Sequence, residues 1–106
     1  MSERTIAVVT TLGTADDARE LASAIVERRL AACAQVSRIE SFYTWKGKLQ
    51  NEDEYRVLFK TAESAWGAIE EAILQLHPYE LPAIHAFAME YAFEAYRDWI
   101  LDSVDS

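Results

Sequence analysis

Cysteine, glycine and proline are all scarce in this chain of 106 residues, which has one Cys, three Gly and two Pro. A single cysteine, Cys33, cannot form an intrachain disulfide, so a disulfide-stapled secreted scaffold is excluded and a cytoplasmic location is expected. With so little Gly and Pro and 51% apolar residues, a disordered or low-complexity chain is excluded as well. We expect one folded domain over residues 1–106.

Basic residues are also in deficit, with 10 Lys and Arg against 18 Asp and Glu and a formal net charge of −8. Duplex nucleic acid and anionic membranes are therefore excluded as main partners, because both need cations on the protein. Divalent cations are not excluded. Residues 1–53 carry a formal charge of −1 and the remainder −7. A solvated acidic surface is the simplest interpretation of that excess.

Long apolar runs and motifs of known chemistry are absent too. The N-terminal apolar stretch, residues 6–9, is far too short for a spanning helix or the core of a signal peptide. The three glycines are scattered, which argues against a Gly-rich phosphate loop. Because no nucleophile elbow and no compelling pairing of base and nucleophile is present, we expect the protein not to be an enzyme.

Hydrophobic periodicity predicts three elements in the first half of the chain. The β-branched run Thr5–Leu12 is typical of a buried strand. Thr14 then caps a helix that ends near residues 28–29. Residues 31–45 form an extended segment whose apolar face switches near residues 37–38, which predicts a bulge or bend there.

The second half continues with a hairpin whose tip is at Gly47 and whose second strand ends at Lys60. Thr61 or Ser64 caps a second helix, which ends at His77 because the next residue is a proline. A fourth strand over residues 83–91 and a closing helix over residues 94–104 complete the pattern. Four aromatic residues fall at core spacing on these helices: Trp66, Phe93, Tyr96 and Trp99.

This order predicts an α+β, ferredoxin-like βαββαβ sandwich, with a long central hairpin and an added C-terminal helix. Its single antiparallel sheet has helices on one face, so the other face needs a cover. The hairpin is also too aromatic for a solvated loop. We expect copies of the chain to bury its large apolar residues, which are Phe42, Tyr43, Trp45 and Leu49.

Five stretches together resemble the CutA divalent-cation tolerance family. They carry the Ala-Ala-Cys, Tyr-x-Trp-x-Gly and His-Pro-Tyr-x-x-Pro elements and are found at residues 29–34, 42–48, 59–61, 77–84 and 96–100. The resemblance implies a homotrimer of ferredoxin-like subunits whose long hairpin strands pair across subunits. It also implies a non-enzymatic protein of the response to metal ions.

The resemblance further implies a weak site for copper or another divalent metal. Cys33 and His77 match family positions proposed as ligands, and Glu80 or Glu90 could add a carboxylate. Two other positions depart from the family pattern. They are Thr10, where some members carry a second Cys, and Ala83, where some carry a Glu.

Each metal candidate has a structural alternative. Cys33 among alanines is typical of a small buried hydrophobe. His77 at a helix end suits bonding to free carbonyls, and its charged form suits the helix dipole. His85, inside a strand, suits packing or cross-strand bonding.

An intersubunit cleft gives a second functional hypothesis. Trp45, Lys60, Tyr79 and Glu80 could line a cleft that resembles the ligand clefts of the trimeric PII signalling proteins. The alternative for two of these residues is a structural ion pair between Lys60 and Glu80. The protein would then be a PII-like small-ligand sensor, or a structural trimer that acts through partner proteins.

Overall fold

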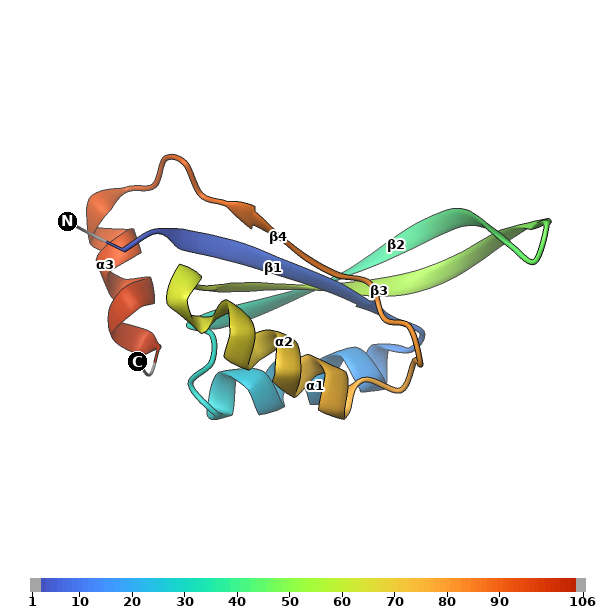
Figure 1. The fold of residues 1–106 in the computed structure, drawn as a ribbon, viewed down its shortest axis with the longest axis horizontal. Coiled ribbons are helices and arrows are strands. Elements are labelled where there is room, and N and C mark those ends of the chain that lie inside the picture. The colour runs from blue at the N-terminus through green and yellow to red at the C-terminus, as the bar shows by residue number, and fades with distance from the viewer. Residues whose placement is uncertain (1–2, 105–106) are drawn as a thin grey trace.

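The computed structural model describes residues 3–104. Its sheet has the strand order β2-β3-β1-β4 with every neighbouring pair antiparallel, and α1 and α2 cover one face (Figure 1). This arrangement confirms the predicted ferredoxin-like α+β fold. The elements are β1 (Thr5–Leu12), α1 (Ala15–Glu27), β2 (Cys33–Trp45), β3 (Lys48–Ala62), a 3₁₀ turn (Glu63–Ala65), α2 (Trp66–Leu76), β4 (Ile84–Ala88) and α3 (Glu94–Ser103).

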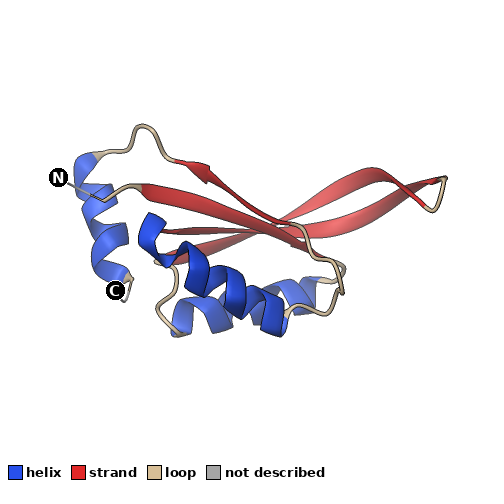
Figure 2. Cartoon of the chain, viewed as in Figure 1, coloured by secondary structure: helices blue, strands red, loops and turns tan. Residues whose placement is uncertain are grey.

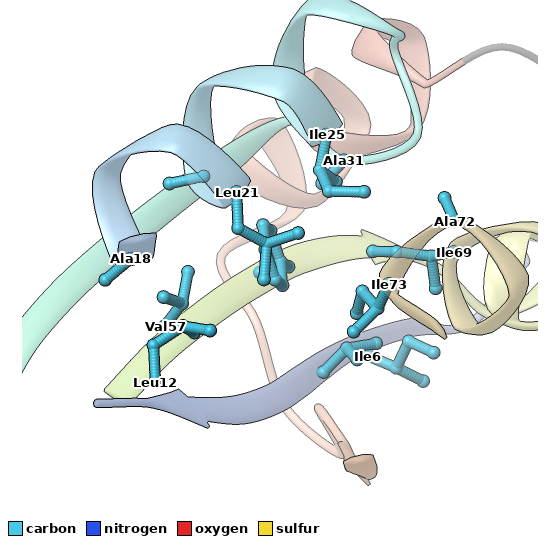
Figure 3. Packing of buried hydrophobic residues seen from close by; sticks show 13 residues of the cluster. Ile6, Leu12, Ala18, Leu21, Ile25, Ala31, Val57, Ile69, Ala72 and Ile73 are labelled. Atoms are coloured by element: carbon cyan, nitrogen blue, oxygen red, sulfur yellow. The ribbon is translucent and has the colours of Figure 1, made fainter. Parts of the chain in front are cut away.

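The core lies between this sheet and the two helices (Figure 3). Side chains of a strand alternate between its two faces, so every second residue of β1 and β3 reaches the helices. Phe59 is the largest of the fully buried side chains, and burying a side chain of this kind stabilises the fold by about 1.5–3 kcal/mol. The helices contribute aliphatic residues to the same cluster, among them Leu21, Ile25, Ile69 and Ile73.

The two helices that cover the sheet begin in different ways. Thr14 caps α1 as predicted, since its Oγ1 accepts a hydrogen bond of 3.1 Å from the Asp17 amide. The predicted cap of the second helix is wrong. Thr61 lies in β3 and donates to the Leu30 carbonyl, and Ser64 lies in the 3₁₀ turn that precedes α2. Non-local contacts therefore set the start of α2.

The hairpin of β2 and β3 runs far beyond the helices and gives the molecule its longest dimension of 48 Å (Figure 2). Its two-residue turn has positive φ at Lys46 (51°) and Gly47 (78°), as a type I′ turn requires. The predicted bulge is absent, because pairing is continuous from Cys33–Lys60 to Trp45–Lys48. The apolar pattern changes because the outer hairpin has no helix against either face.

The C-terminal part departs from prediction in two ways. β4 ends at Ala88 and not at residue 91, because β1 begins at Thr5 and leaves later residues without a neighbouring strand. α3 lies across the end of the sheet, where Ile100 is fully buried (Figure 1). Two aromatic residues at predicted core positions are exposed: Phe93, which precedes α3, is 77% exposed, and Trp99 of α3 is 48% exposed.

Candidate functional site

A groove of about 730 Å³ lies between the outer part of the hairpin and the loop of residues 77–83. We call three of its residues, Glu52, Glu54 and Glu80, the groove carboxylates. Three others, Tyr43, Trp45 and Tyr79, are the groove aromatics. The remaining lining residues are Thr11, Gln50, Leu81 and Ala83. The lining holds no Lys, Arg or His.

Strand register places this groove on the sheet face that the helices leave open. Val57 and Phe59 of β3 belong to the core, so residues of β3 at the alternate positions face the other way. Glu52 and Glu54 are at such positions, and Tyr43 pairs with Gln50 on the same face. The open face of the sheet thus forms the floor of the groove.

His77 fixes the loop that forms one wall. Its Nε2 lies 2.8 Å from the Thr11 carbonyl oxygen, and its Nδ1 accepts a hydrogen bond of 3.1 Å from the Tyr79 amide. A carbonyl can only accept, so Nε2 carries the proton and the ring is the neutral tautomer. The side chain is 7% exposed. Both ring nitrogens are therefore engaged, and neither offers a free lone pair to a metal ion.

Tyr79 is held from two further directions. Its ring packs on the His77 ring at a centroid distance of 4.7 Å. Its hydroxyl lies where a Cβ on Gly13 would come within 3.0 Å. The absence of a side chain at Gly13 thus leaves room for the Tyr79 hydroxyl. The contacts with Gly13 and His77 hold the Tyr79 ring in the groove wall.

The groove has a negative potential. Burial raises the pKa of the Tyr79 phenol most, followed by the charges of Glu54 and Glu52. The pKa of Tyr43 is raised by desolvation, by its hydrogen bond to Glu52 and by the charges of the same two carboxylates. Within residues 3–104, no groove carboxylate forms an ion pair with a cationic side chain.

The groove gathers only part of the predicted cleft. Trp45, Tyr79 and Glu80 line this groove together within one protomer, whereas the predicted cleft lies between subunits. Lys60 does not line the groove: it lies near the other end of β3, where its ammonium donates to the Tyr96 hydroxyl at 3.0 Å. The alternative ion pair of Lys60 with Glu80 does not form. The pKa of Lys60 is raised, and the main cause is its hydrogen bond to Tyr96.

The predicted metal ligands are likewise apart in one protomer. Cys33 pairs with Lys60, whereas His77 contacts Thr11, which pairs with Arg56. Lys60 and Arg56 are four residues apart on β3, which corresponds to about 13 Å along the strand at about 3.3 Å per residue. In the part of the chain that the structure describes, no three His, Cys, Asp or Glu side chains are grouped to hold a metal ion.

The structural alternatives fare differently. Cys33 is half-buried and not fully buried. His77 does bond a carbonyl, but that carbonyl belongs to β1 and not to the helix end. His85 is exposed and packs edge-on against Phe87 at 5.3 Å, in line with the packing prediction. Glu90 is exposed in the loop after β4.

The sequence interpretation missed Glu52 and Glu54. Their signal was present, because a turn at residues 46–47 fixes which residues of the two strands pair. That register puts Gln50, Glu52 and Glu54 on the face of Tyr43. The aromatic content of the hairpin does not by itself reveal the alternating acids of the return strand.

The four predicted interface residues are all exposed, but they divide between two faces. Tyr43 and Trp45 stand over the groove. Phe42 pairs with Asn51 and Leu49 with Thr44, which places both on the opposite face of the hairpin. Phe42 is 64% and Leu49 74% exposed.

Residues 6–103 match the family described as CutA1 divalent ion tolerance protein. A probable divalent-cation tolerance protein cutA homolog of Encephalitozoon cuniculi is 40% identical over 97% of this chain and 90% of its own length. The divalent-cation tolerance protein CutA of Pyrococcus horikoshii is 33% identical, over 92% of this chain and 95% of its own length.

Solved structures agree with these relatives. CutA from Synechococcus elongatus matches with a TM-score of 0.94 and 34% identity, over 98% of this chain and 93% of that one. The periplasmic divalent cation tolerance protein CutA of Archaeoglobus fulgidus matches with a TM-score of 0.92 and 27% identity, over 95% and 99% of the two chains. In this chain, none of the helices within residues 3–104 has the length and apolar character needed to cross a membrane.

Proposed function

Because the chain belongs to the CutA1 divalent ion tolerance family, we propose that it acts in divalent-cation tolerance as a homotrimer that binds divalent cations weakly and catalyses no reaction. The observation that carries this proposal is the groove, whose three carboxylates have no cationic partner among the described residues. Carboxylate oxygens suit divalent cations such as Mn²⁺. Within residues 3–104 no preformed cage holds these ligands, so we expect dissociation constants of about 10⁻⁴ to 10⁻³ M.

Copper binding by Cys33, His77 and Glu80 enters the proposal under two conditions. The thiol and the imidazole would have to come from different protomers, since about 13 Å separates their levels within one sheet. The His77 ring would also have to release the Thr11 carbonyl or the Tyr79 amide. The same separation is the reason why we propose no catalytic pair of Cys33 and His77.

Titration calorimetry on the metal-free protein tests the cation site. We expect Mn²⁺ to bind, and the triple replacement of the groove carboxylates by Gln to weaken it at least tenfold. Glu71→Gln, an exposed carboxylate on α2, is the matched control and should leave the affinity unchanged. Equal Mn²⁺ affinity in the triple variant and in the control would contradict the proposal.

Copper is titrated separately into Cys33→Ala and His77→Ala. A loss of affinity in both variants supports the shared copper site. If neither variant changes the affinity, these two residues are not the ligands.

The trimer rests on the exposure of the hairpin. Its large apolar residues stand on both faces, and no strand among the described residues pairs with the outer edge of β2 in one protomer. A neighbouring copy would cover both. Sedimentation equilibrium at micromolar concentration should give about three times the 12.0 kDa of one chain, and a 12.0 kDa species would exclude the trimer.

A PII-like small-ligand sensor, or a structural trimer acting through partner proteins, is the second candidate. The volume and the aromatic lining of the groove favour the small-ligand sensor, because ligand pockets typically enclose about 300–1,000 Å³. A thermal-shift screen separates the candidates: stabilisation by metals alone favours the first, and stabilisation by metabolites the second. The single cysteine favours a cytoplasmic site of action for either, which cell fractionation tests.

A further inference from the structure

The groove contains more than a divalent cation needs. A metal ion is bound through oxygen, nitrogen or sulfur atoms, yet three of the lining residues present aromatic rings. Its volume of about 730 Å³ is also that of a site for an organic molecule. The combination of aromatic faces with carboxylates is the one that recognises organic cations, which are attracted by the ring faces and by the negative charges together.

The charge of the groove is not neutralised by the rest of the described chain. Lys48 and Arg56 share this face of β3, but they lie beyond the two ends of the run Gln50–Glu54, and neither forms an ion pair with another residue of the range 3–104. Lys60, farther along this face, donates to the Tyr96 hydroxyl, and Arg38 binds Asp53 on the opposite face of the hairpin. An anionic ligand such as a nucleotide would meet repulsion, whereas a cation would meet attraction.

The aromatic walls are already in place. The hydrogen bonds of His77 hold the loop against β1, and its ring contact holds Tyr79. Trp45, at the end of β2, is paired with Lys48 through the strand register and remains 56% exposed. A ligand that enters between these rings therefore needs little rearrangement of the backbone, which lowers the entropy lost on binding.

We propose that the groove binds a small organic ammonium ion, with the groove aromatics in contact with its alkylated nitrogen and the groove carboxylates balancing its charge. The inference concerns the surface to which divalent cations are assigned above, but it stands on the aromatic rings and holds whether or not a metal binds.

Choline and its neutral carbon isostere, 3,3-dimethylbutan-1-ol, are the probes, since they have nearly the same shape and differ in charge. Binding to the full chain is measured by ligand-observed NMR in the presence of EDTA. We expect choline to bind at least tenfold more tightly than the alcohol. Equal affinities would show an apolar groove with no preference for a cation and would overturn the inference.

Two variants with matched controls locate the site. We expect Trp45→Leu and Glu54→Gln each to weaken choline about fivefold or more, as loss of one cation–π or charge contact implies. Trp99→Leu removes a half-exposed Trp outside the groove, and Glu71→Gln an exposed carboxylate on α2; both should bind as the parent does. Circular dichroism confirms that all four are folded. Weakened choline binding in the controls, or unchanged choline binding in the groove variants, would contradict the proposed site.

The outcomes also separate this inference from the proposed function. Mn²⁺ binding without choline binding overturns the inference and leaves the metal proposal intact. Choline binding without Mn²⁺ binding supports the inference and overturns the metal proposal. A trimer whose neighbouring copy fills the groove would bind neither probe, and that result overturns the inference too.

Discussion

We expect replacement of His77 to lower the stability of the protein, because its imidazole supports the loop of residues 77–83. The imidazole makes two hydrogen bonds across the groove wall, to the Thr11 carbonyl and from the Tyr79 amide. Each contributes about 1 kcal/mol net. His77→Phe keeps the ring but loses both bonds, so we expect about 2 kcal/mol less stability. His77→Ala also loses the ring packing, and we expect about 3 kcal/mol.

Urea unfolding at pH 7, followed by circular dichroism, measures these losses at one fixed protein concentration, because assembly would make stability concentration-dependent. His85→Ala is the matched control. This second histidine is exposed on β4 and touches Phe87 only through its ring edge, so its replacement should cost less than about 0.5 kcal/mol.

Two results would refute the reasoning. If His77→Ala cost no more than His85→Ala, the two hydrogen bonds would not hold the loop. If His77→Phe were as stable as the parent but lost copper binding, the imidazole would be a ligand and not a support. The pair of variants thus distinguishes the two roles, which a single alanine replacement cannot do.

Three further predictions follow from contacts outside the groove. Tyr96→Phe should cost about 1 kcal/mol at pH 7 in urea unfolding, and because folding raises the pKa of Lys60 above its ordinary 10.5, this difference should vanish as the pH rises through the folded-state pKa. Glu63→Gln should make stability fall less steeply below about pH 4.5. The Arg4 guanidinium lowers the pKa of Glu63, so the stability that this ion pair contributes is lost as the pH falls through the lowered pKa of the folded state. Gly47→Ala, at a φ of 78°, should destabilise by about 1 kcal/mol, whereas Gly67→Ala in α2 should stabilise by up to about 1 kcal/mol; equal signs would contradict this.

Local signals made most of the fold predictable. β1 runs over the predicted residues, the Thr14 cap forms, the turn is at Gly47, and α2 ends before Pro78. Each of these depends on a few neighbouring residues, and hydrophobic periodicity gave the elements between them. Strand order then followed from the order of elements, because a split βαβ repeat has one common topology.

The errors arose where distant residues decide. The segment before α2 is tied to the start of the chain, as the Ser64 amide donates to Glu3 Oε2 at 2.6 Å, and no local pattern encodes that bond. β4 ends where β1 begins, which depends on a partner strand more than eighty residues away, as the pairing of Ala88 with Ile6 shows. His77 reaches the Thr11 carbonyl across a similar gap.

The candidate site was half predictable for the same reason. A loop motif and a hairpin motif each supplied residues, Tyr79 and Glu80 from one and Trp45 from the other, and the fold brings the two together. The position of Lys60 at a strand end predicts a place in this cleft. However, Lys60 pairs with Ala7 and lies near the end of β3 that is far from the groove.

The register of the hairpin also divides two roles that its aromatic content had merged. The sequence predicts Trp45 for the cleft and, with Phe42 and Leu49, for the trimer interface. Because side chains alternate between faces, Trp45 stands over the groove while the other two point away from it. Phe42 and Leu49 therefore have no ligand to explain their exposure, and a second copy of the chain is what their face of the hairpin requires.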